Sequence, residues 1–429
     1  MFRRSAETLA TPSFPETRSA KTVPHPKSPY SRVLPESAAP GAATSSGAVP
    51  DEILATDAMT AIATAAGILM IVVILWDAFE TIVLSRRVSR KFRLTRLFYR
   101  AAWAPWSAIA RRIPAGNARE NFIMVFGPLS LILLLGAWAA GLIGSYALLH
   151  WGLGSHLSAS NGAHGFRTDL YMSGTTFFTL GLGDVTPGTQ TARFLTVLES
   201  GMGFGFLALV IGYLPTVSQA FSRREVNISL LDARAGSPPT AALLLRRHSQ
   251  DGGTQALCEL LAEWERWSAE LLESHVSFPV LSYFRSQHDN QSWVAALTTI
   301  LDVCALSIAG LDKAPARTAR LTFAIARHAV VDLCAVFHRR PIPPPADRLP
   351  PSELVRLRRF LSESGIHLSE GEAAESKLAA LRLMYEPYVY ALGQFLIMPV
   401  PDWIPPADAR ENWRGSASGV RPPSISDLI

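Results

Sequence analysis

The hydrophobic residues of this chain are concentrated in three long runs. Residues 122–149 and 194–221 form two runs of 28 residues, the first uncharged and the second with a single acid, Glu199. Residues 59–76 add 18 uncharged positions. A helix of about 20 apolar residues crosses the hydrocarbon core of a bilayer, and soluble helices of this length keep a polar face that these runs lack. The pattern therefore predicts three transmembrane helices.

The basic residues of the connecting loops predict the orientation of these helices. Residues 85–121 hold ten basic residues and one acid, whereas residues 151–168 hold a single arginine. Cytoplasmic loops are enriched in Lys and Arg, so we expect the first loop inside the cell and the second outside. This orientation places the N-terminus outside, unless the first run does not span. It places the C-terminal half in the cytoplasm, in a multi-pass protein of the cell (inner) membrane.

The basic loop contains a segment that is both basic and aromatic. Residues 92–113 mix arginine with leucine and tryptophan, which is typical of a helix lying in the membrane interface; a solvated connector is the alternative. Asp77 and Glu80 lie three residues apart near the inner end of the first run. Because this is the headgroup region and not the midplane, we expect them to pair with the following arginines rather than to form an ion pathway.

A short segment between the second and third runs carries the most specific chemistry. Residues 169–178 are long enough for about three helical turns but too short to span. Six residues follow them directly: Thr179, Leu180, Gly181, Leu182, Gly183 and Asp184. Glycine at alternate positions admits left-handed conformations, which turn successive carbonyls of an extended strand to one side. Four copies around an axis would stack rings of carbonyl oxygens that replace the hydration shell of a monovalent cation.

The order of these segments resembles the pore of the potassium channel family, in its prokaryotic type with one pore loop between two helices. The resemblance covers about residues 122–222. The family signature, Thr-x-x-Thr-Val/Ile-Gly-Tyr/Phe-Gly-Asp, is matched by Thr176, Thr179, Gly181, Gly183 and Asp184. Two positions depart from it. Leu180 replaces valine or isoleucine, and Leu182 replaces the aromatic residue that usually braces the filter.

This resemblance implies a selectivity filter and a homotetramer, since one pore loop per chain requires four chains per pore. It implies K⁺ as the permeant ion and no other cofactor. The ion would be held by the backbone carbonyls of Thr179, Leu180, Gly181 and Leu182. The leucine at position 182 leaves open how strictly potassium is selected over sodium.

The third run carries the candidate support and gating residues. We expect Glu199 to brace the short helix; the alternative is that it adds negative potential to the pore cavity. Its candidate partners are the hydroxyls of Ser173, Thr175 and Thr176. Gly203 lies where family members have a hinge glycine, although small residues also permit close helix packing. Pro215 removes a helix hydrogen bond near the cytoplasmic mouth, where we expect it to kink the gate.

The C-terminal half has the pattern of a helical domain without strands. Residues 254–272 place their large apolar side chains on one stripe, as an amphipathic helix does. Residues 293–311 are nearly apolar but contain Asp302, and we expect a core helix there rather than a fourth span. Residues 275–293 gather His, Tyr, Arg, Gln and Trp. We expect a polar corner satisfied within the protein, with an effector pocket as the alternative.

Composition completes the prediction of domains. Residues 1–50 are rich in Ser, Ala, Pro and Thr and are expected to be a disordered tail. The remaining parts are the first helix with a basic interfacial linker (51–121), a pore domain (122–222), a helical cytoplasmic domain (223–410) and a flexible tail (411–429). The predicted fold class is an all-α membrane protein. It has three transmembrane helices, a re-entrant pore helix with a selectivity filter, and an all-α cytoplasmic C-terminal domain.

Charge and motif content narrow the function. A net charge of +5 without a basic-aromatic surface argues against a nucleic-acid partner, and three cysteines without a CxxC argue against a zinc site. No nucleophile–base pair is evident, so we expect no enzyme. The leading hypothesis is a potassium-preferring homotetrameric channel in the lipid bilayer, gated through its cytoplasmic domain by an unknown effector. The alternatives are a non-selective monovalent cation channel and a membrane-anchored signalling or scaffold protein with a silent pore.

Overall fold

The structure is a computed structural model that describes residues 49–84, 93–159, 162–248, 253–288, 290–311 and 315–406, with side chains from residue 57 onwards. Among these residues helices dominate, and a small antiparallel sheet pairs β1 (Leu157–Ala159) with β2 (Val185–Pro187). The predicted tails 1–50 and 411–429 lie outside the described residues, except for 49 and 50, which begin the first helix.

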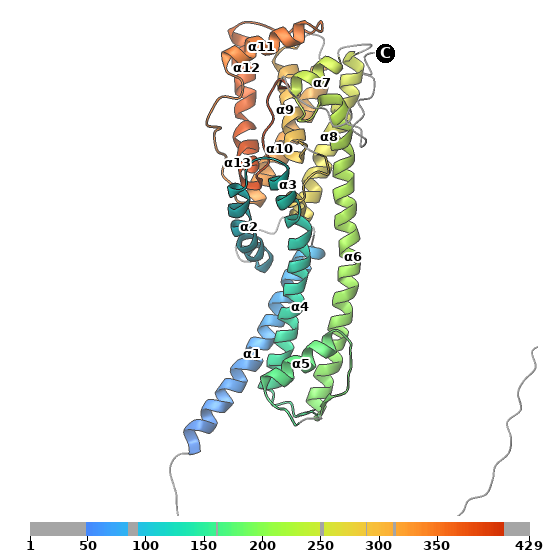
Figure 1. Ribbon diagram of the computed structural model, residues 1–429, viewed down its shortest axis with the longest axis vertical. Helices are drawn as coiled ribbons and strands as arrows, with labels where there is room; N and C mark the ends of the chain where they lie inside the picture. Colours follow the sequence, from blue (N-terminus) through green and yellow to red (C-terminus); the bar gives the residue numbers. More distant parts are fainter. Residues whose placement is uncertain are drawn as a thin grey trace, which may run out of the picture. The chain divides into compact units, whose positions relative to one another are not determined.

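The helices follow one another along the chain as Figure 1 labels them. The N-terminal half contains α1 (Val49–Ile82), α2 (Leu94–Arg112), α3 (Asn117–Met124), α4 (Phe126–Gly152), α5 (Phe166–Phe177) and α6 (Gln190–Ala235). The C-terminal half contains α7 (Ala241–Arg247), α8 (Gly253–Ser277), the 3₁₀ helix η1 (Pro279–Tyr283), α9 (Trp293–Ala309), α10 (Ala316–Val336), α11 (Pro351–Ser362), α12 (Glu372–Leu383) and α13 (Glu386–Leu396).

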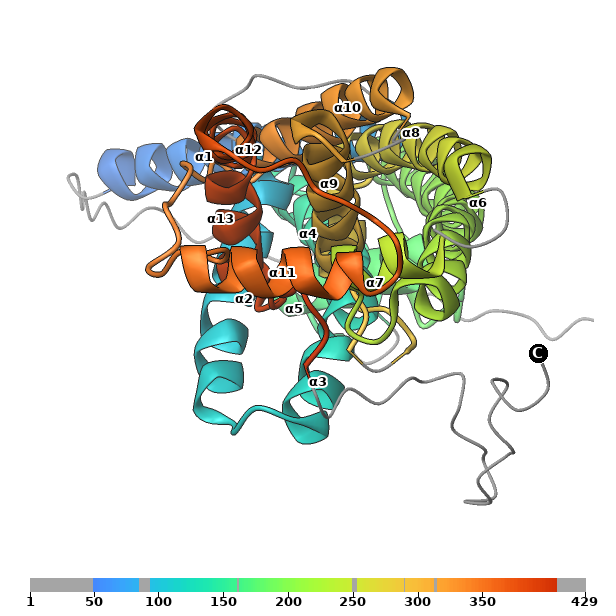
Figure 2. The same cartoon turned by 90° about the horizontal axis from the view of Figure 1, so that it is seen from above.

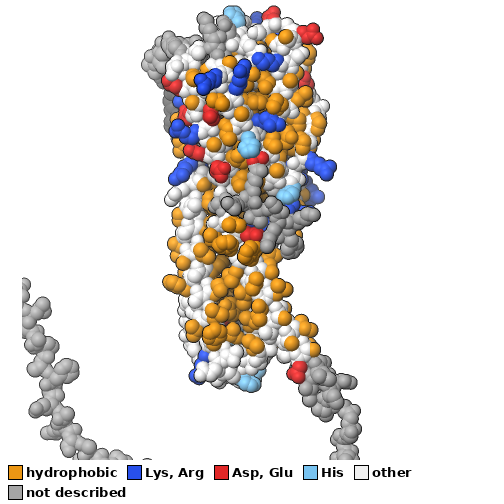
Figure 3. Space-filling view, turned by 180° about the vertical axis from the view of Figure 1, so that it is seen from behind, with side chains coloured by type: hydrophobic (Ala, Val, Ile, Leu, Met, Phe, Trp, Pro, Cys, Tyr) orange, Lys and Arg blue, Asp and Glu red, His pale blue; other side chains and the backbone are white. Residues whose placement is uncertain are grey.

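Three helical stretches are long and apolar enough to cross a membrane. They are Asp57–Ile82, Asn117–Gly152 and Gln190–Ala235, and they contain the three predicted runs. Hydrophobic side chains cover the lower half of the molecule, where these helices lie, while charged side chains gather over the C-terminal helices (Figure 3). The predicted class, an all-α membrane protein with three spans and a helical C-terminal region, is confirmed.

Small residues bring α1 and α4 close together. A Cβ on Gly67 of α1 would lie 2.8 Å from the carbonyl oxygen of Ser145. A Cβ on Gly152 of α4 would lie 2.8 Å from the carbonyl oxygen of Thr60. In lipid, where no hydrophobic effect drives helices together, such close backbone approach is a main source of packing. The first span is therefore packed on the second.

The corner between α1 and α2 is held by the two acids of the first span. Glu80 pairs with Arg93 at 3.5 Å, as expected. Asp77 instead accepts the backbone N–H of Thr95 at 3.0 Å, in the first turn of α2, and the indole N–H of Trp138 at 3.1 Å. A carboxylate at a helix N-terminus satisfies an otherwise unpaired N–H and is favoured by the helix dipole.

The aromatic face of α2 packs on the C-terminal helices, which the interfacial interpretation did not foresee. Trp103 is buried, and its indole N–H donates to the carbonyl of Phe395 in α13 at 3.1 Å. The ring of Tyr99 stacks on that of Tyr283 in η1, with centroids 5.5 Å apart. The mixed arginine–aromatic pattern thus also serves contact between the basic linker and the C-terminal domain.

The helix α6 runs without a break through the boundary predicted at residue 222. The sequence suggested an end near residue 221, where charged residues begin, but the helix continues to Ala235. Ile228, Leu231 and Ala235 are completely buried in the core of the C-terminal half. One helix therefore leaves the segment 179–189 and ends inside the C-terminal domain.

The helix α9 is the centre of the C-terminal half. All its residues are buried, and it contacts α7, α8, α10, α12 and α13, which surround it in the view from above (Figure 2). This confirms the predicted core helix. Its one acid, Asp302, accepts a hydrogen bond from Arg348 at 2.8 Å and another from the phenol of Tyr385, and Arg348 also pairs with Glu386 at 3.0 Å.

The polar residues of 275–293 are satisfied largely within the protein. Arg285 donates to the carbonyl of Ile397 at 2.7 Å, and burial lowers its pKa to about 10, which leaves it charged at neutral pH. Gln291 donates to the carbonyl of Gly236 at 3.0 Å. The Nδ1 of His275 lies 2.9 Å from the carbonyl oxygen of Leu271. The side chains of Arg285, Gln291 and His275 are thus bonded within the protein, as the polar-corner interpretation expects.

Candidate pore and selectivity filter

The short helix predicted before the glycine motif is α5. It begins at Phe166, three residues earlier than expected, and ends at Phe177. Beyond it, the N–H of Leu180 donates to the carbonyl of Thr175 at 2.8 Å, and the N–H of Thr179 donates to that of Thr176 at 2.9 Å. These two bonds form a Schellman motif, in which a residue in the left-handed conformation terminates the helix.

Thr179 occupies this left-handed position, with φ of 57°. Glycine usually takes it, because a side chain there costs about 1–2 kcal/mol. A threonine in this conformation is therefore strained, and such strain is concentrated at functional sites. The first residue of the predicted filter is thus also the residue that caps α5.

The backbone changes hand at every second residue of the predicted filter. Gly181 has φ of 56° and Gly183 has φ of 78°, after 57° at Thr179. The alternation is the conformation that the spacing of the glycines suggested, and it is open to positions 181 and 183 because glycine lacks a Cβ. In an extended strand, such alternation is the way in which successive carbonyls can be turned toward one side. A row of carbonyl dipoles that share one direction is able to coordinate a cation.

The outer end of the predicted filter is tied to α5 through Asp184. The phenol of Tyr171 donates to Oδ2 of Asp184 at 2.8 Å, and the N–H of Val185 donates to Oδ1 at 3.1 Å. The sequence interpretation named Asp184 but missed Tyr171. A signal was available, because Tyr171 is the one phenol on the short helix and lies 13 residues before the acid.

Glu199 contacts the short helix from behind. It is completely buried and accepts a hydrogen bond from the hydroxyl of Ser173, which also lies within 2.8 Å of the carbonyl of Ile143 in α4. Of the three candidate partners, Ser173 is the one that makes the bond. The hydroxyl of Thr175 donates instead to the carbonyl of Met172 at 3.0 Å.

His150 of α4 is a further member of this buried cluster that the sequence did not indicate. Its Nε2 lies 3.8 Å from Oε2 of Glu199, and both side chains are fully buried. The cluster therefore joins α4, α5 and α6 through one carboxylate. An acid in a membrane span is stable only with such polar partners.

Gly203 lets α6 cross directly against the end of α5. A Cβ at this position would lie 1.9 Å from the carbonyl oxygen of Phe177 and 2.8 Å from its carbonyl carbon. The close-packing alternative for Gly203 is therefore observed, while the hinge role stays a prediction. Pro215 lies within α6, three turns further toward the C-terminal half.

The predicted filter and one side of α6 are exposed in the single chain. Leu182 is 64% exposed, and on α6 Val197 and Phe204 are 73% and 70% exposed. The apolar side chains of α6 are suited to lipid or to other protein chains, and not to water. The exposed strand at residues 179–184 has no cover among the described residues of this chain.

The comparisons with known proteins agree with this geometry. A family model described as "Ion channel" matches residues 131–219, which extend from α4 through α5 and the predicted filter into α6. The predicted resemblance to an ion channel family is confirmed over this stretch. The chain is also similar to the "Uncharacterized membrane protein YdjJ" of Bacillus subtilis (strain 168), with 24% identity over 203 residues, 47% of this chain and 57% of that protein. No solved structure matches the chain.

Proposed function

We propose that this protein is a potassium-preferring channel of the cell membrane, whose pore is formed by four copies of residues 122–222 around one axis. The observation that carries the proposal is the alternating backbone of Thr179, Gly181 and Gly183 directly after a capped helix. Four such strands would supply rings of carbonyl oxygens at Thr179, Leu180, Gly181 and Leu182. Each K⁺ would exchange its water shell for these oxygens.

The uncovered surface of the chain supports assembly around an axis. A filter strand at membrane depth must be buried in protein or face a water-filled path, because lipid cannot satisfy its N–H and C=O groups. Neighbouring copies would meet this requirement and would also cover the exposed apolar side of α6. Four chains is the number that the resemblance to the potassium channel family implies for a chain with one pore loop.

The continuity of α6 supports gating through the C-terminal domain, which we place in the cytoplasm. The helix that lines the proposed pore ends among buried residues of that domain. Movement of the domain would therefore act on the pore through a helix and not through a flexible linker. Pro215, where one helix hydrogen bond is missing, is the position at which α6 would bend with least resistance.

The test is ion flux in liposomes that contain the purified protein, with potassium and sodium gradients compared. Gly183→Ala adds a Cβ to a left-handed residue at about 1–2 kcal/mol per subunit, and we expect permeation to collapse. Gly154→Ala is the matched control. Gly154 is also left-handed, with φ of 58°, and a Cβ at either glycine has nothing within 4 Å in the chain, but Gly154 lies outside the proposed filter. The same strain there leaves flux intact.

Leu182→Tyr tests selectivity separately. It restores the aromatic residue usual in the family, so flux persists and the preference for potassium over sodium is equal or sharper. If potassium and sodium permeate the wild-type protein equally, the proposed potassium preference is wrong and the protein is a non-selective cation channel. Unchanged conduction and selectivity in Gly183→Ala would show that residues 179–184 are not the filter.

A further inference from the structure

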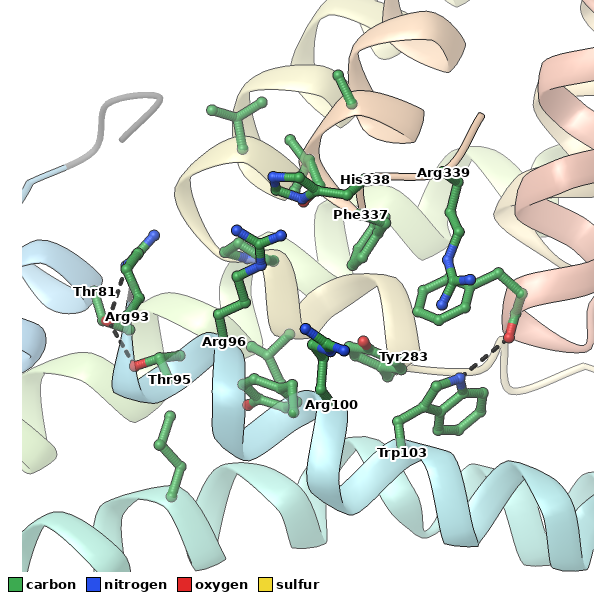
Figure 4. Close-up of a pocket in the computed structure, with 18 of the residues that line it drawn as sticks. Thr81, Arg93, Thr95, Arg96, Arg100, Trp103, Tyr283, Phe337, His338 and Arg339 are labelled. Carbon is green, nitrogen blue, oxygen red and sulfur yellow. Dashed lines mark hydrogen bonds between the residues drawn. The ribbon is translucent and has the colours of Figure 1, made fainter. Parts of the chain in front are cut away.

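A large cavity lies where the inner ends of the spans meet the C-terminal helices. Its volume is about 1020 Å³, at the upper end of the range of small-ligand sites. Its walls come from the end of α1, from α2, η1 and the end of α10, and from α13 (Figure 4). Leu134 of α4 and Tyr213 of α6 also line it. The cavity thus touches all three spans and the C-terminal domain.

The charge of the cavity is strongly positive. Five arginines line it, together with two acids and His338. The arginines are Arg93, Arg96, Arg100, Arg111 and Arg339. The two acids already have partners, since Glu80 pairs with Arg93 at 3.5 Å and Asp332 lies 3.2 Å from His328. An excess of positive charge therefore remains.

Among the described residues, the side chains of Arg100 and Arg339 make neither a hydrogen bond nor an ion pair, whereas Arg111 donates to the carbonyl of Gln394 at 2.7 Å. The Arg100 side chain projects from α2 toward Tyr283 (Figure 4). Arg339 follows the end of α10, and its guanidinium lies over the ring of Phe395 at 4.0 Å, with no carboxylate partner among those residues. A cation held on an aromatic face keeps its N–H groups available at the edge.

The remaining wall is aromatic, with a polar phenol. Ring surface is supplied by Trp103, Phe337 and Phe395. The indole N–H of Trp103 donates to the backbone carbonyl of Phe395 at 3.1 Å, which fixes the position of its ring. Burial raises the pKa of the Tyr283 phenol above its ordinary value, so that it stays protonated and is a hydrogen-bond donor at neutral pH. The cavity therefore offers cationic and phenolic donors beside an apolar surface.

We propose that this cavity binds a phosphate-bearing anion, with Arg100 and Arg339 on the phosphate oxygens. Arginine is suited to this role because its planar fork donates two parallel hydrogen bonds to phosphate. Two sources have this chemistry, the headgroup of an anionic lipid and free phosphate. An occupant would contact Tyr213, two residues before Pro215, as well as the C-terminal domain. The site is therefore placed to link α6 to the C-terminal domain, whether or not the pore selects potassium.

Binding is tested on the purified full-length protein in detergent by isothermal titration calorimetry. The probes are dioctanoyl phosphatidic acid, inorganic phosphate and dioctanoyl phosphatidylcholine, whose headgroup has no net charge. Arg100→Gln and Arg339→Gln each remove a charged donor, and we expect each to weaken binding of the anion about tenfold. Arg112→Gln and Arg340→Gln are the matched controls, since these arginines flank the same segments but do not line the cavity.

The possible results distinguish a lipid headgroup from free phosphate, and each of them from a cavity that binds no phosphate group. Binding of phosphatidic acid that inorganic phosphate does not displace identifies a lipid headgroup, and binding of inorganic phosphate with the same arginine dependence identifies free phosphate. Equal affinities in the cavity variants and in the controls, or equally tight binding of phosphatidylcholine, would overturn the proposal. Binding is measured without ion flux, so a failed filter assay does not affect the result.

Discussion

The crossing of α6 over the end of α5 yields a sharp prediction for Gly203→Ala. The added Cβ would lie 1.9 Å from the carbonyl oxygen of Phe177, whereas carbon–oxygen contacts rarely fall below about 3.3 Å. The end of α5 must therefore retreat by more than about 1 Å. Overpacking of this kind costs about 1–3 kcal/mol, of which the better helix propensity of alanine returns about 1 kcal/mol.

The consequence for function exceeds the consequence for stability. Phe177 lies two residues before Thr179, and the Schellman bonds tie the strand of the proposed filter to the last turn of α5. Binding sites work only when their groups are held within about 0.5 Å of the required geometry. We therefore expect Gly203→Ala to lower potassium flux in liposomes at least tenfold, and to lower the melting temperature of the purified protein only slightly.

Gly205→Ala is the matched control, because it lies on the same helix and a Cβ there has nothing within 4 Å in the chain. We expect this variant to keep its flux and to gain slightly in stability from the helix propensity of alanine. If Gly203→Ala and Gly205→Ala conduct and select equally well, the contact with Phe177 does not position the filter and the reasoning is refuted.

Three further predictions concern the C-terminal half and the topology. Arg348→Ala leaves the buried Asp302 without its cation and should lower the free energy of unfolding by about 3–5 kcal/mol. The control Arg356→Ala removes an exposed ion pair with Glu353 and should cost at most about 1 kcal/mol. Denaturant titration of the full chain measures both values. Burial holds the pKa of His275 well below 6.5, so below pH 6.5 the unfolded chain binds more protons than the folded chain. The free energy of unfolding therefore decreases as the pH falls, by at most about 1.4 kcal/mol per pH unit. His275→Phe should flatten this pH dependence. A cysteine at Ser158 should react with an impermeant thiol reagent added outside the cell. A cysteine at Ser362 should react only after the cells are permeabilised. The reverse pattern would contradict the predicted orientation.

The spans and the core helix could be predicted because hydrophobic periodicity is a local property. Residues 122–149 have no charge to place in water, and any fold must bury them or expose them to lipid. The same reasoning separated α9 from the spans, since Asp302 in an apolar run requires a buried partner. The partner itself, Arg348, lies 46 residues away, and no local pattern links the two.

The contacts around the predicted filter could be predicted only in part, because they are made between elements. Glu199 was identified as an acid in a span, yet its bond to Ser173 depends on how α5 and α6 cross. His150 gave no signal of its own, since a histidine at a helix end is common. Tyr171 is the one phenol on the short helix, but its bond to Asp184 depends on how the following strand folds back. The full length of α6 could not be predicted either, because a local pattern there pointed the wrong way. Its last turns look soluble by sequence, although the domain that surrounds them buries one face.

The bond between Tyr171 and Asp184 bears on the leucine at position 182. In the family that the chain resembles, an aromatic residue at this position braces the strand through its polar tip, and leucine has no such tip. Here a phenol from α5 reaches the acid at the outer end of the same strand, while the Schellman motif fixes the inner end at Thr179 and Leu180. A strand held at both ends needs less support in its middle. The departure at position 182 is therefore compatible with a defined filter geometry.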